Sequence, residues 1–272
     1  MKSMVLSRSL QALALILWGA VLVYFHTSGR LVKYLAPDFR VIAFLGGLGL
    51  VVVGLFCLLT AREYATCGHQ HGPEDTHDHE SLDIHPIGAF LILVAPLLLA
   101  TGWTKDSYSL AALTRKGLDD TAAESGIFLA STLPPLTKEI IERQHPPDEN
   151  GYRQFPLLEL FFSSADPEMR GLVGGMQVVT EGRLIRDPDP HAPANQRRLY
   201  RLFITCCAAD SRPIPIIARF KDAPPEVEDN TWIRLSGTIG YPDEGEGHHA
   251  VLEVDFAKVT DPPVEESFMR GF

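Results

Sequence analysis

The sequence predicts an α-helical membrane region of three transmembrane helices, followed by a small all-β soluble domain that is an OB-like five-stranded barrel. Two observations lead to this fold class. The N-terminal part of the chain contains three long apolar runs without a charge, whereas the C-terminal part alternates apolar and polar residues in short segments separated by turns. The whole chain has 272 residues, of which 46% are hydrophobic, and a net charge of −10.

The three apolar runs are Leu10 to Thr27, Val41 to Thr60 and Ile87 to Trp103. Each approaches or reaches the roughly 20 residues that a helix needs to cross a bilayer, and the proline of the third run is tolerated in a membrane helix. Residues 1–104 are therefore interpreted as a membrane region, and the protein as a multi-pass protein of the bacterial plasma (inner) membrane, in contact with the lipid bilayer. The glycines of the second run predict no specific contact, because glycine is common in membrane helices.

Between the second and third runs lies a histidine-rich loop, residues 61–86. Five of the ten histidines of the chain fall in it. Imidazole is the commonest protein ligand of transition metals, and the loose spacing with Gly and Pro is typical of a collector rather than of a closed structural site. The alternative is a solvated polar connection. The candidate ligands of this loop are Cys67, His69, His71, His77, His79 and His85.

Residues 105–150 lack periodicity and contain proline pairs, so we interpret them as a linker with one helical turn at 137–143. A short helix is expected from Phe155 to Phe162, ending before the sequence Ala165-Asp-Pro, which we interpret as a helix breaker.

The β domain is expected over residues 151–260, with a C-terminal tail at 261–272. Its glycines at 182 and 237 lie inside predicted strands, where a small barrel needs bends or bulges. Five strands separated by turn-rich segments, with no long helix between them, favour an OB-like barrel over an immunoglobulin-like sandwich, which needs about seven strands. The predicted strands are 175–187, 198–207, 214–221, 231–241 and 249–259.

The second of these strands ends in the sequence Cys206-Cys-Ala-Ala-Asp210, whose last three residues begin the following turn. Because adjacent strand residues point to opposite faces, we expect Cys206 to be buried and Cys207 to face outward or towards the turn. Cys206, Cys207 and Asp210 are candidate ligands of a Zn²⁺ ion, with His248 and His249 as partners if the fold brings them near. The alternative is that Cys206 is a small core residue and Cys207 has no role.

Three stretches carry a family resemblance: Cys-Cys-Ala-Ala-Asp at 206–210, Gly-Leu-Val-Gly-Gly-Met-Gln-Val-Val at 171–179 and Trp-Ile-Arg-Leu-Ser-Gly at 232–237. Together with the membrane runs before them, they resemble the YcgQ-like family of poorly characterised bacterial membrane proteins. The resemblance implies a predicted membrane permease as the partner and no established catalytic residues.

No phosphate-cradling loop, zinc-protease motif, serine-nucleophile motif or dinucleotide fingerprint occurs in the sequence. From Gly151 onward acidic residues outnumber basic ones, which speaks against binding of nucleic acid. We expect an accessory subunit of a permease that collects or senses a transition metal, first of all zinc, and does not form the pore. The alternatives are a thiol-redox or metal-dependent enzyme that uses Cys207, and a membrane anchor that presents a protein-binding barrel.

Overall fold

The computed structural model describes residues 2–61, 85–103, 136–244 and 247–269. The chain divides into two compact units, Met1–Ser107 and Tyr108–Phe272. The first is helical and the second is built around a β-sheet.

The helical unit consists of α1 (Lys2–Thr27), the short 3-10 helix η1 (Arg30–Lys33), α2 (Pro37–Thr60) and α3 (Pro86–Trp103). Pro37 lies in the first turn of α2, where its missing N–H has no helical partner to lose. Two helices, α1 over Val5–Thr27 and α2, are long and apolar enough to cross a membrane, whereas the apolar part of α3 is shorter. These two helices are candidate membrane spans and support association with a membrane, and the expectation of three spans is not confirmed.

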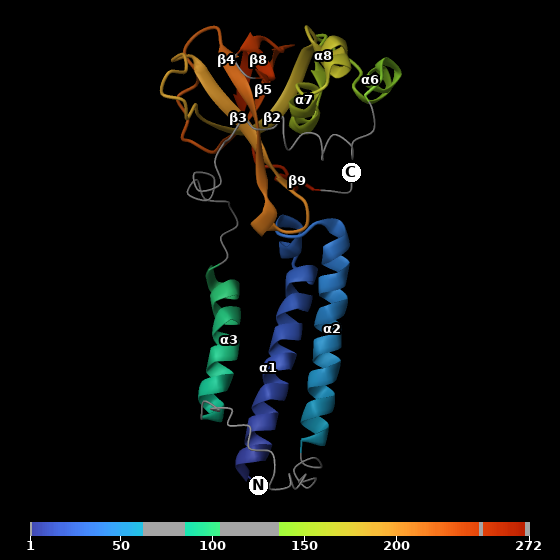
Figure 1. The fold of residues 1–272 in the computed structure, drawn as a ribbon, viewed down its shortest axis with the longest axis vertical. Helices are drawn as coiled ribbons and strands as arrows, with labels where there is room; N and C mark the ends of the chain where they lie inside the picture. The colour runs from blue at the N-terminus through green and yellow to red at the C-terminus, as the bar shows by residue number, and fades with distance from the viewer. Residues whose placement is uncertain (1, 62–84, 104–135, 245–246, 270–272) are drawn as a thin grey trace, which may run out of the picture. The chain divides into compact units, whose positions relative to one another are not determined.

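Glycines determine how closely α1 and α2 approach each other, and the two helices lie side by side along their length (Figure 1). A Cβ added at Gly54 would come within 2.7 Å of Ile16 Cγ1, and one at Gly19 within 2.5 Å of the carbonyl oxygen of Gly47. The expectation that these glycines make no specific contact is therefore wrong for Gly47 and Gly54. On the other side of α1, the indole N–H of Trp18 donates to the carbonyl of Leu93 in α3, at 3.0 Å.

The second unit contains a seven-stranded sheet in the order β1-β2-β5-β8-β4-β3-β9, with a further pairing between β2 and β3. The five predicted strands are confirmed as β2, β3, β4, β5 and β8. Shorter strands that the sequence pattern did not predict flank them. The strands are β1 (Arg153–Gln154), β2 (Gln177–Arg186), β3 (Gln196–Ile204), β4 (Arg212–Phe220), β5 (Thr231–Gly240), β6 (Asp243–Glu244), β7 (Gly247–His248), β8 (Val251–Val259) and β9 (Ser267–Met269).

The prediction of a small β domain is confirmed, but the sheet has seven strands instead of five and does not close into a complete barrel. The sheet curls back so that β2 pairs with β5 on one edge and with β3 on the other. The β2–β3 pairing covers only Arg183–Arg186, because the first part of the same edge of β2 pairs with β1 at Val178 and Val179. The barrel is therefore open along part of its length.

In the part of this unit that the structure describes, three short α-helices accompany the sheet: α6 (Lys138–Gln144), α7 (Leu157–Ser163) and α8 (Pro167–Val173). The first two confirm the predicted turn and helix. The third was missed, because Asp166-Pro was interpreted as a breaker. Asp166 is instead the N-cap of α8 and accepts from Glu168 N at 2.8 Å, with proline in the first turn.

The core of the β domain lies between α7 and the inner face of the sheet. A bulge between Ser236 and Gly237 bends β5, and a Cβ added at Gly237 would come within 2.1 Å of the carbonyl oxygen of Glu253. This confirms the expected bend at Gly237. The side chains that are almost fully buried include Leu157, Leu160, Leu199, Ile216, Ile233, Leu235, Ile239 and Leu252.

The last described residues are held by two arginines. Arg201 Nε donates to the carbonyl oxygen of Glu266 at 3.3 Å, and its guanidinium lies 4.2 Å from the ring of Phe268. Arg183 forms an ion pair with Glu266 and stacks on Trp232, 5.3 Å from the ring. Part of the expected tail, residues 261–272, is thus the strand β9, which pairs with the end of β3.

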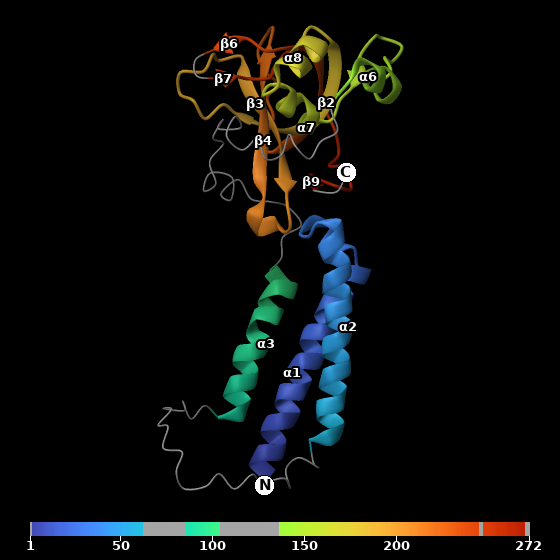
Figure 2. The same cartoon turned by 45° about the vertical axis from the view of Figure 1, so that its right-hand side comes forward.

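The β3–β4 hairpin extends beyond the neighbouring strands of the sheet (Figures 1 and 2). The β2–β3 pairing ends at Tyr200, and the β4–β8 pairing begins at Ile217. Beyond these positions β3 and β4 pair with each other, and β9 joins only β3. The turn that joins the two strands therefore lies at a projecting tip of this domain.

Candidate metal site in the β3–β4 turn

The candidate site is the turn between Ile204 and Arg212. Its centre is the short 3-10 helix η2 (Ala208–Asp210), in which Asp210 N donates to the carbonyl oxygen of Cys207 at 3.0 Å. Cys207 itself has an extended backbone, so the chain reverses direction immediately after the two cysteines.

The carboxylate of Asp210 organises this turn. One of its oxygens accepts from Cys206 N at 2.7 Å and the other from Thr205 N at 3.2 Å. An aspartate that binds backbone N–H groups a few residues away is a common way to stabilise a turn. Because these N–H groups are taken by a side chain, they cannot extend the β-ladder, and β3 ends at Ile204.

Both thiols lie beside this carboxylate. The Sγ atoms of Cys206 and Cys207 and a carboxylate oxygen of Asp210 all lie within 4.8 Å of one another. Both cysteines are half-buried, so the expectation of a buried Cys206 is wrong. Cys207 was expected to face outward or towards the turn, and its sulfur lies beside the Asp210 carboxylate of the turn. The burial of Cys206 differs from the expectation because strand alternation applies only as far as Ile204, and the two cysteines belong to the turn.

The contacts change the acidity of the turn in opposite directions. The hydrogen bond to Asp210, followed by burial and the neighbouring Cys207, raises the pKa of the Cys206 thiol to about 11. Burial raises the pKa of Asp210, but bonds from the Cys206 thiol and from backbone N–H groups together outweigh it and hold this pKa below its usual value. At neutral pH Asp210 is ionised and the Cys206 thiol keeps its proton.

Two sulfurs and one carboxylate oxygen are donors that fit a borderline divalent ion such as Zn²⁺, because zinc accepts both cysteine and aspartate as ligands. Binding requires the thiols to lose their protons, so the ion replaces protons at the site. Among the residues that the structure describes, this is the one group of three or more His, Cys, Asp or Glu side chains with metal-ligand spacing.

Of the other predicted ligands, those that the structure describes do not belong to this group. Cys67, His69, His71, His77 and His79 lie outside the described residues. His85 is exposed directly before α3, where its Nδ1 accepts from Ile87 N at 3.4 Å. His249 is half-buried and is not a member of the group, and the side chain of His248 lies outside the described part of the chain.

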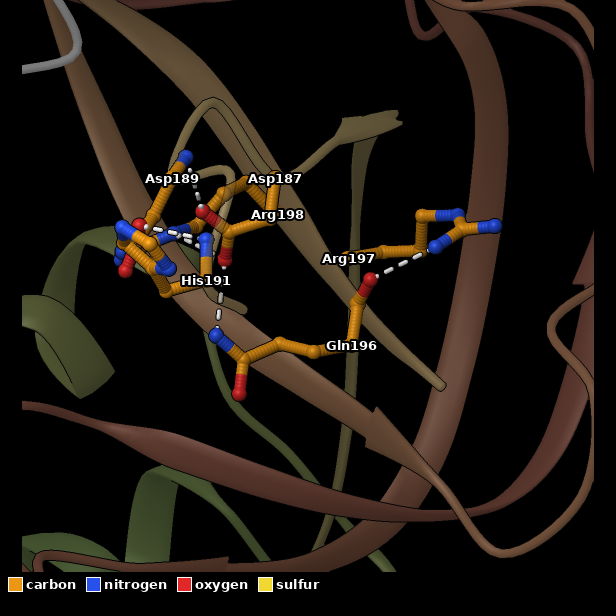
Figure 3. Close-up of polar contacts among 6 residues, drawn as sticks. All are labelled: Asp187, Asp189, His191, Gln196, Arg197 and Arg198. Atoms are coloured by element: carbon orange, nitrogen blue, oxygen red, sulfur yellow. Dashed lines mark hydrogen bonds and ion pairs between the residues drawn. The ribbon is translucent and has the colours of Figure 1, made fainter. Parts of the chain in front are cut away.

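A second cluster of acidic and basic residues organises the β2–β3 loop (Figure 3). The buried carboxylate of Asp187 accepts from Arg198 Nε at 2.9 Å and from Gln196 Nε2 at 2.8 Å. Asp189 accepts from the backbone N–H of His191 at 2.9 Å. All these donors and acceptors stabilise the loop, so this Asp-Pro-Asp-Pro-His sequence is a loop anchor rather than a ligand set.

A buried His–Glu pair was missed by the sequence interpretation, which placed His145 in a linker. The ring of His145 stacks on Phe155 at 4.2 Å, and its Nδ1 lies 2.6 Å from the carbonyl oxygen of Gln154. Its Nε2 lies 3.0 Å from Glu159 Oε2. Burial raises the pKa of Glu159, although His145 opposes the shift. No local sequence pattern predicts this pair, because its two residues belong to different elements of the fold.

Two cavities of about 280 Å³ each border the β4–β5 connection, and both are lined by Pro225. One also contacts Arg186 and Arg197, and the other Lys221 and Asp255. Neither includes the cysteines, and we place the candidate site at the turn because its donor chemistry is specific.

The fold and the turn define a class of protein: candidate membrane-spanning helices joined to a β-sheet domain that presents a Cys-Cys-x-x-Asp turn. The chain belongs to the DUF1980 family, which is uncharacterised. The model of the DUF1980 N-terminal domain matches residues 10–111, and that of the DUF1980 C-terminal domain matches residues 173–266. The candidate turn lies inside the second match.

No curated protein matches the chain. Two solved structures show distant similarity. A protein described as an aspartyl-tRNA synthetase from Leishmania major Friedlin has 10% identity and a TM-score of 0.25, with 55% of this chain and 27% of that chain covered. A small single-stranded DNA-binding protein from Streptomyces coelicolor has 10% identity and a TM-score of 0.22, with 32% and 94% covered. This chain thus spans about a quarter of the first, and neither likeness carries a functional argument.

Proposed function

We propose that this protein is an accessory subunit of a membrane permease in the bacterial plasma membrane and that it handles a transition-metal ion, first of all zinc, as cargo. The observation that supports the proposal is the meeting of Cys206, Cys207 and Asp210 within 4.8 Å at a projecting turn. The helices α1 and α2, joined by α3 as a third span, would anchor the domain in the bilayer. The permease partner is what the resemblance to the YcgQ-like family implies, and the histidine-rich loop as a collector is an expectation from the sequence.

The composition of the site favours a bound ion over a thiol nucleophile. A nucleophilic cysteine needs a thiolate at neutral pH, and the raised pKa of Cys206 opposes this. A divalent ion, in contrast, displaces the thiol protons itself, because thiolate is the form that it binds. The redox alternative therefore depends on Cys207 alone.

The proposal is tested with the full chain in detergent, in a background in which Cys67, His69, His71, His77, His79 and His85 are alanine. This background removes the loop ligands. Cys207→Ser should weaken zinc binding by at least about tenfold, or about 1.4 kcal/mol, because a neutral hydroxyl replaces a thiolate. Zinc affinity is measured by competition with a chelating dye.

Cys57→Ser is the matched control, since Cys57 is a half-buried cysteine within α2. It should bind zinc as the background protein does. Equal affinities for Cys207→Ser and Cys57→Ser would remove the turn as a metal site, and the metal hypothesis would then rest on the histidine-rich loop alone.

A further inference from the structure

We propose that the Cys206–Cys207–Asp210 turn keeps one coordination position of its ion open and that this position takes a neutral imidazole-type nitrogen ligand from outside the turn. The inference rests on the proposed metal-handling function and adds how the ion enters and leaves. With this open position, the turn would exchange its metal ion with other ligands and would not hold the ion permanently.

The three donors of the site belong to one short turn. All three come from five consecutive residues, and their ligand atoms lie within 4.8 Å of one another. Asp210 is held in place by Thr205 N and Cys206 N, so its carboxylate is fixed to the backbone of the same turn. Zinc takes four ligands in a tetrahedron, at about 2.0–2.3 Å. Three donors from one short turn leave the fourth direction pointing away from it.

The residues of the turn are partly open to solvent. Cys206, Cys207 and Asp210 are each half-buried, and Ala209 and Arg212 beside them are exposed. The turn stands at the end of a hairpin that extends past the last β2–β3 and the first β4–β8 pairs. An open position in this place can be reached by a side chain of another segment or another protein.

The net charge of an ion bound by the three turn ligands favours a neutral fourth ligand. Two thiolates and the Asp210 carboxylate around a divalent ion leave one net negative charge. A fourth anionic ligand would raise this to two in a half-buried site of a chain whose net charge is already −10. A neutral imidazole leaves the charge unchanged and is a common zinc ligand. It enters through its unprotonated nitrogen and displaces a water molecule, so no proton or electron changes place.

An open fourth position distinguishes zinc sites that exchange ligands from closed structural sites, in which protein side chains occupy all four positions. At this turn, an incoming imidazole could begin to remove the ion while the three turn donors still hold it. The chemistry thus fits a relay, in which a histidine-bearing donor or acceptor docks at the tip.

The experiment uses the full chain in detergent, in the background without loop ligands, loaded with Co²⁺ as a spectroscopic substitute for zinc. Imidazole is the probe and acetate is the anionic control. We expect a saturable change in the cobalt d–d absorption with imidazole, while the thiolate-to-cobalt charge-transfer band and the bound cobalt are retained. Acetate at the same concentration should change the spectrum at least about tenfold less, and Cys207→Ser should lower the charge-transfer intensity.

The outcomes separate this inference from the proposed function. A cobalt spectrum that imidazole does not alter, with cobalt still bound, would show a closed site and overturn the inference alone. Removal of cobalt by imidazole without a bound intermediate spectrum, or an equal response to acetate, would also overturn it. Failure of the background protein to bind cobalt or zinc would instead remove the turn as a metal site, and with it the observation that supports the proposed function.

Discussion

Two clusters of titratable side chains in the β domain differ in how far they are exposed to solvent, and this difference bears on function. His145 and Glu159 form a pair between α6 and α7, in which the histidine is 6% exposed and the side chain of the glutamate 22%. Cys206, Cys207 and Asp210 form a half-buried group at a hairpin tip. In the first cluster the polar atoms face each other or the backbone. In the second, all three residues are half-buried and the neighbouring Ala209 and Arg212 are exposed. Burial thus separates a cluster that holds the fold from one that can bind a ligand.

The two carboxylates of these clusters show the same difference in their acidity. Burial raises the pKa of Glu159, and the single nearby histidine does not cancel the effect. Asp210 also loses solvation, but N–H groups and the Cys206 thiol donate to it and lower its pKa. The direction in which the pKa of a carboxyl group shifts thus depends on the hydrogen-bond donors around it as well as on its burial.

The largest effect is expected from breaking the buried pair. His145→Ala removes the ring that stacks on Phe155 and leaves Glu159 without its partner, so the free energy of unfolding should fall by about 3 kcal/mol. The measurement is urea denaturation of the full chain in detergent. Zinc binding by the folded protein should not change, because the turn does not contact this pair.

His191→Ala is the matched control for this prediction. His191 is exposed in the β2–β3 loop, so its removal should change stability by less than about 0.5 kcal/mol. A similar stability loss in both histidine variants would contradict the distinction between the two clusters.

A smaller effect is expected at the turn. Asp210→Asn keeps one acceptor oxygen, but its amide nitrogen cannot accept from the second backbone N–H. Stability should therefore fall by about 1 kcal/mol, and zinc affinity should fall as well because one anionic ligand is lost. Thermal unfolding with and without zinc measures both effects, since a ligand of the native state raises the midpoint.

Asp189→Asn provides the comparison for this variant. Asp189 is an exposed aspartate whose Oδ1 accepts from one backbone N–H, and asparagine keeps that bond. It should leave stability and the zinc-induced shift unchanged. If Asp210→Asn behaved in the same way, the carboxylate would not be what organises the turn.

The smallest effect is a dependence of stability on pH. Because the pKa of Glu159 is raised in the folded protein, the folded state keeps this proton to higher pH than the unfolded chain does. The stabilisation is complete below the unfolded glutamate pKa of about 4.3 and is lost as the pH rises through the folded value. The urea midpoint, followed upward from about pH 4.3, should fall less steeply in Glu159→Gln than in the parent. Parallel pH profiles would exclude this origin.

The sequence by itself determined the elements that depend on local patterns. The uncharged apolar runs predicted the helices α1 and α2, because a bilayer span needs length and hydrophobicity and little else. Period-2 alternation predicted the five long strands, and Gly237 predicted a bend that the bulge confirms. It failed at Asp166-Pro, where the residues that interrupt one helix also begin the next.

The candidate site could be predicted from the sequence only in part. A turn containing both cysteines and Asp210 was predictable from residues a few positions apart. The direction of the thiols was not, because it depends on which backbone N–H groups the Asp210 carboxylate takes and hence on where β3 ends.

Only the tertiary structure decided the partners that are distant in the sequence. It placed His145 against Glu159, and it placed Arg201 against β9. It also set the short β2–β3 pairing that leaves the barrel open and the hairpin tip projecting. These contacts follow from how the chain closes its loops around the core, and no spacing or periodicity of nearby residues records that choice.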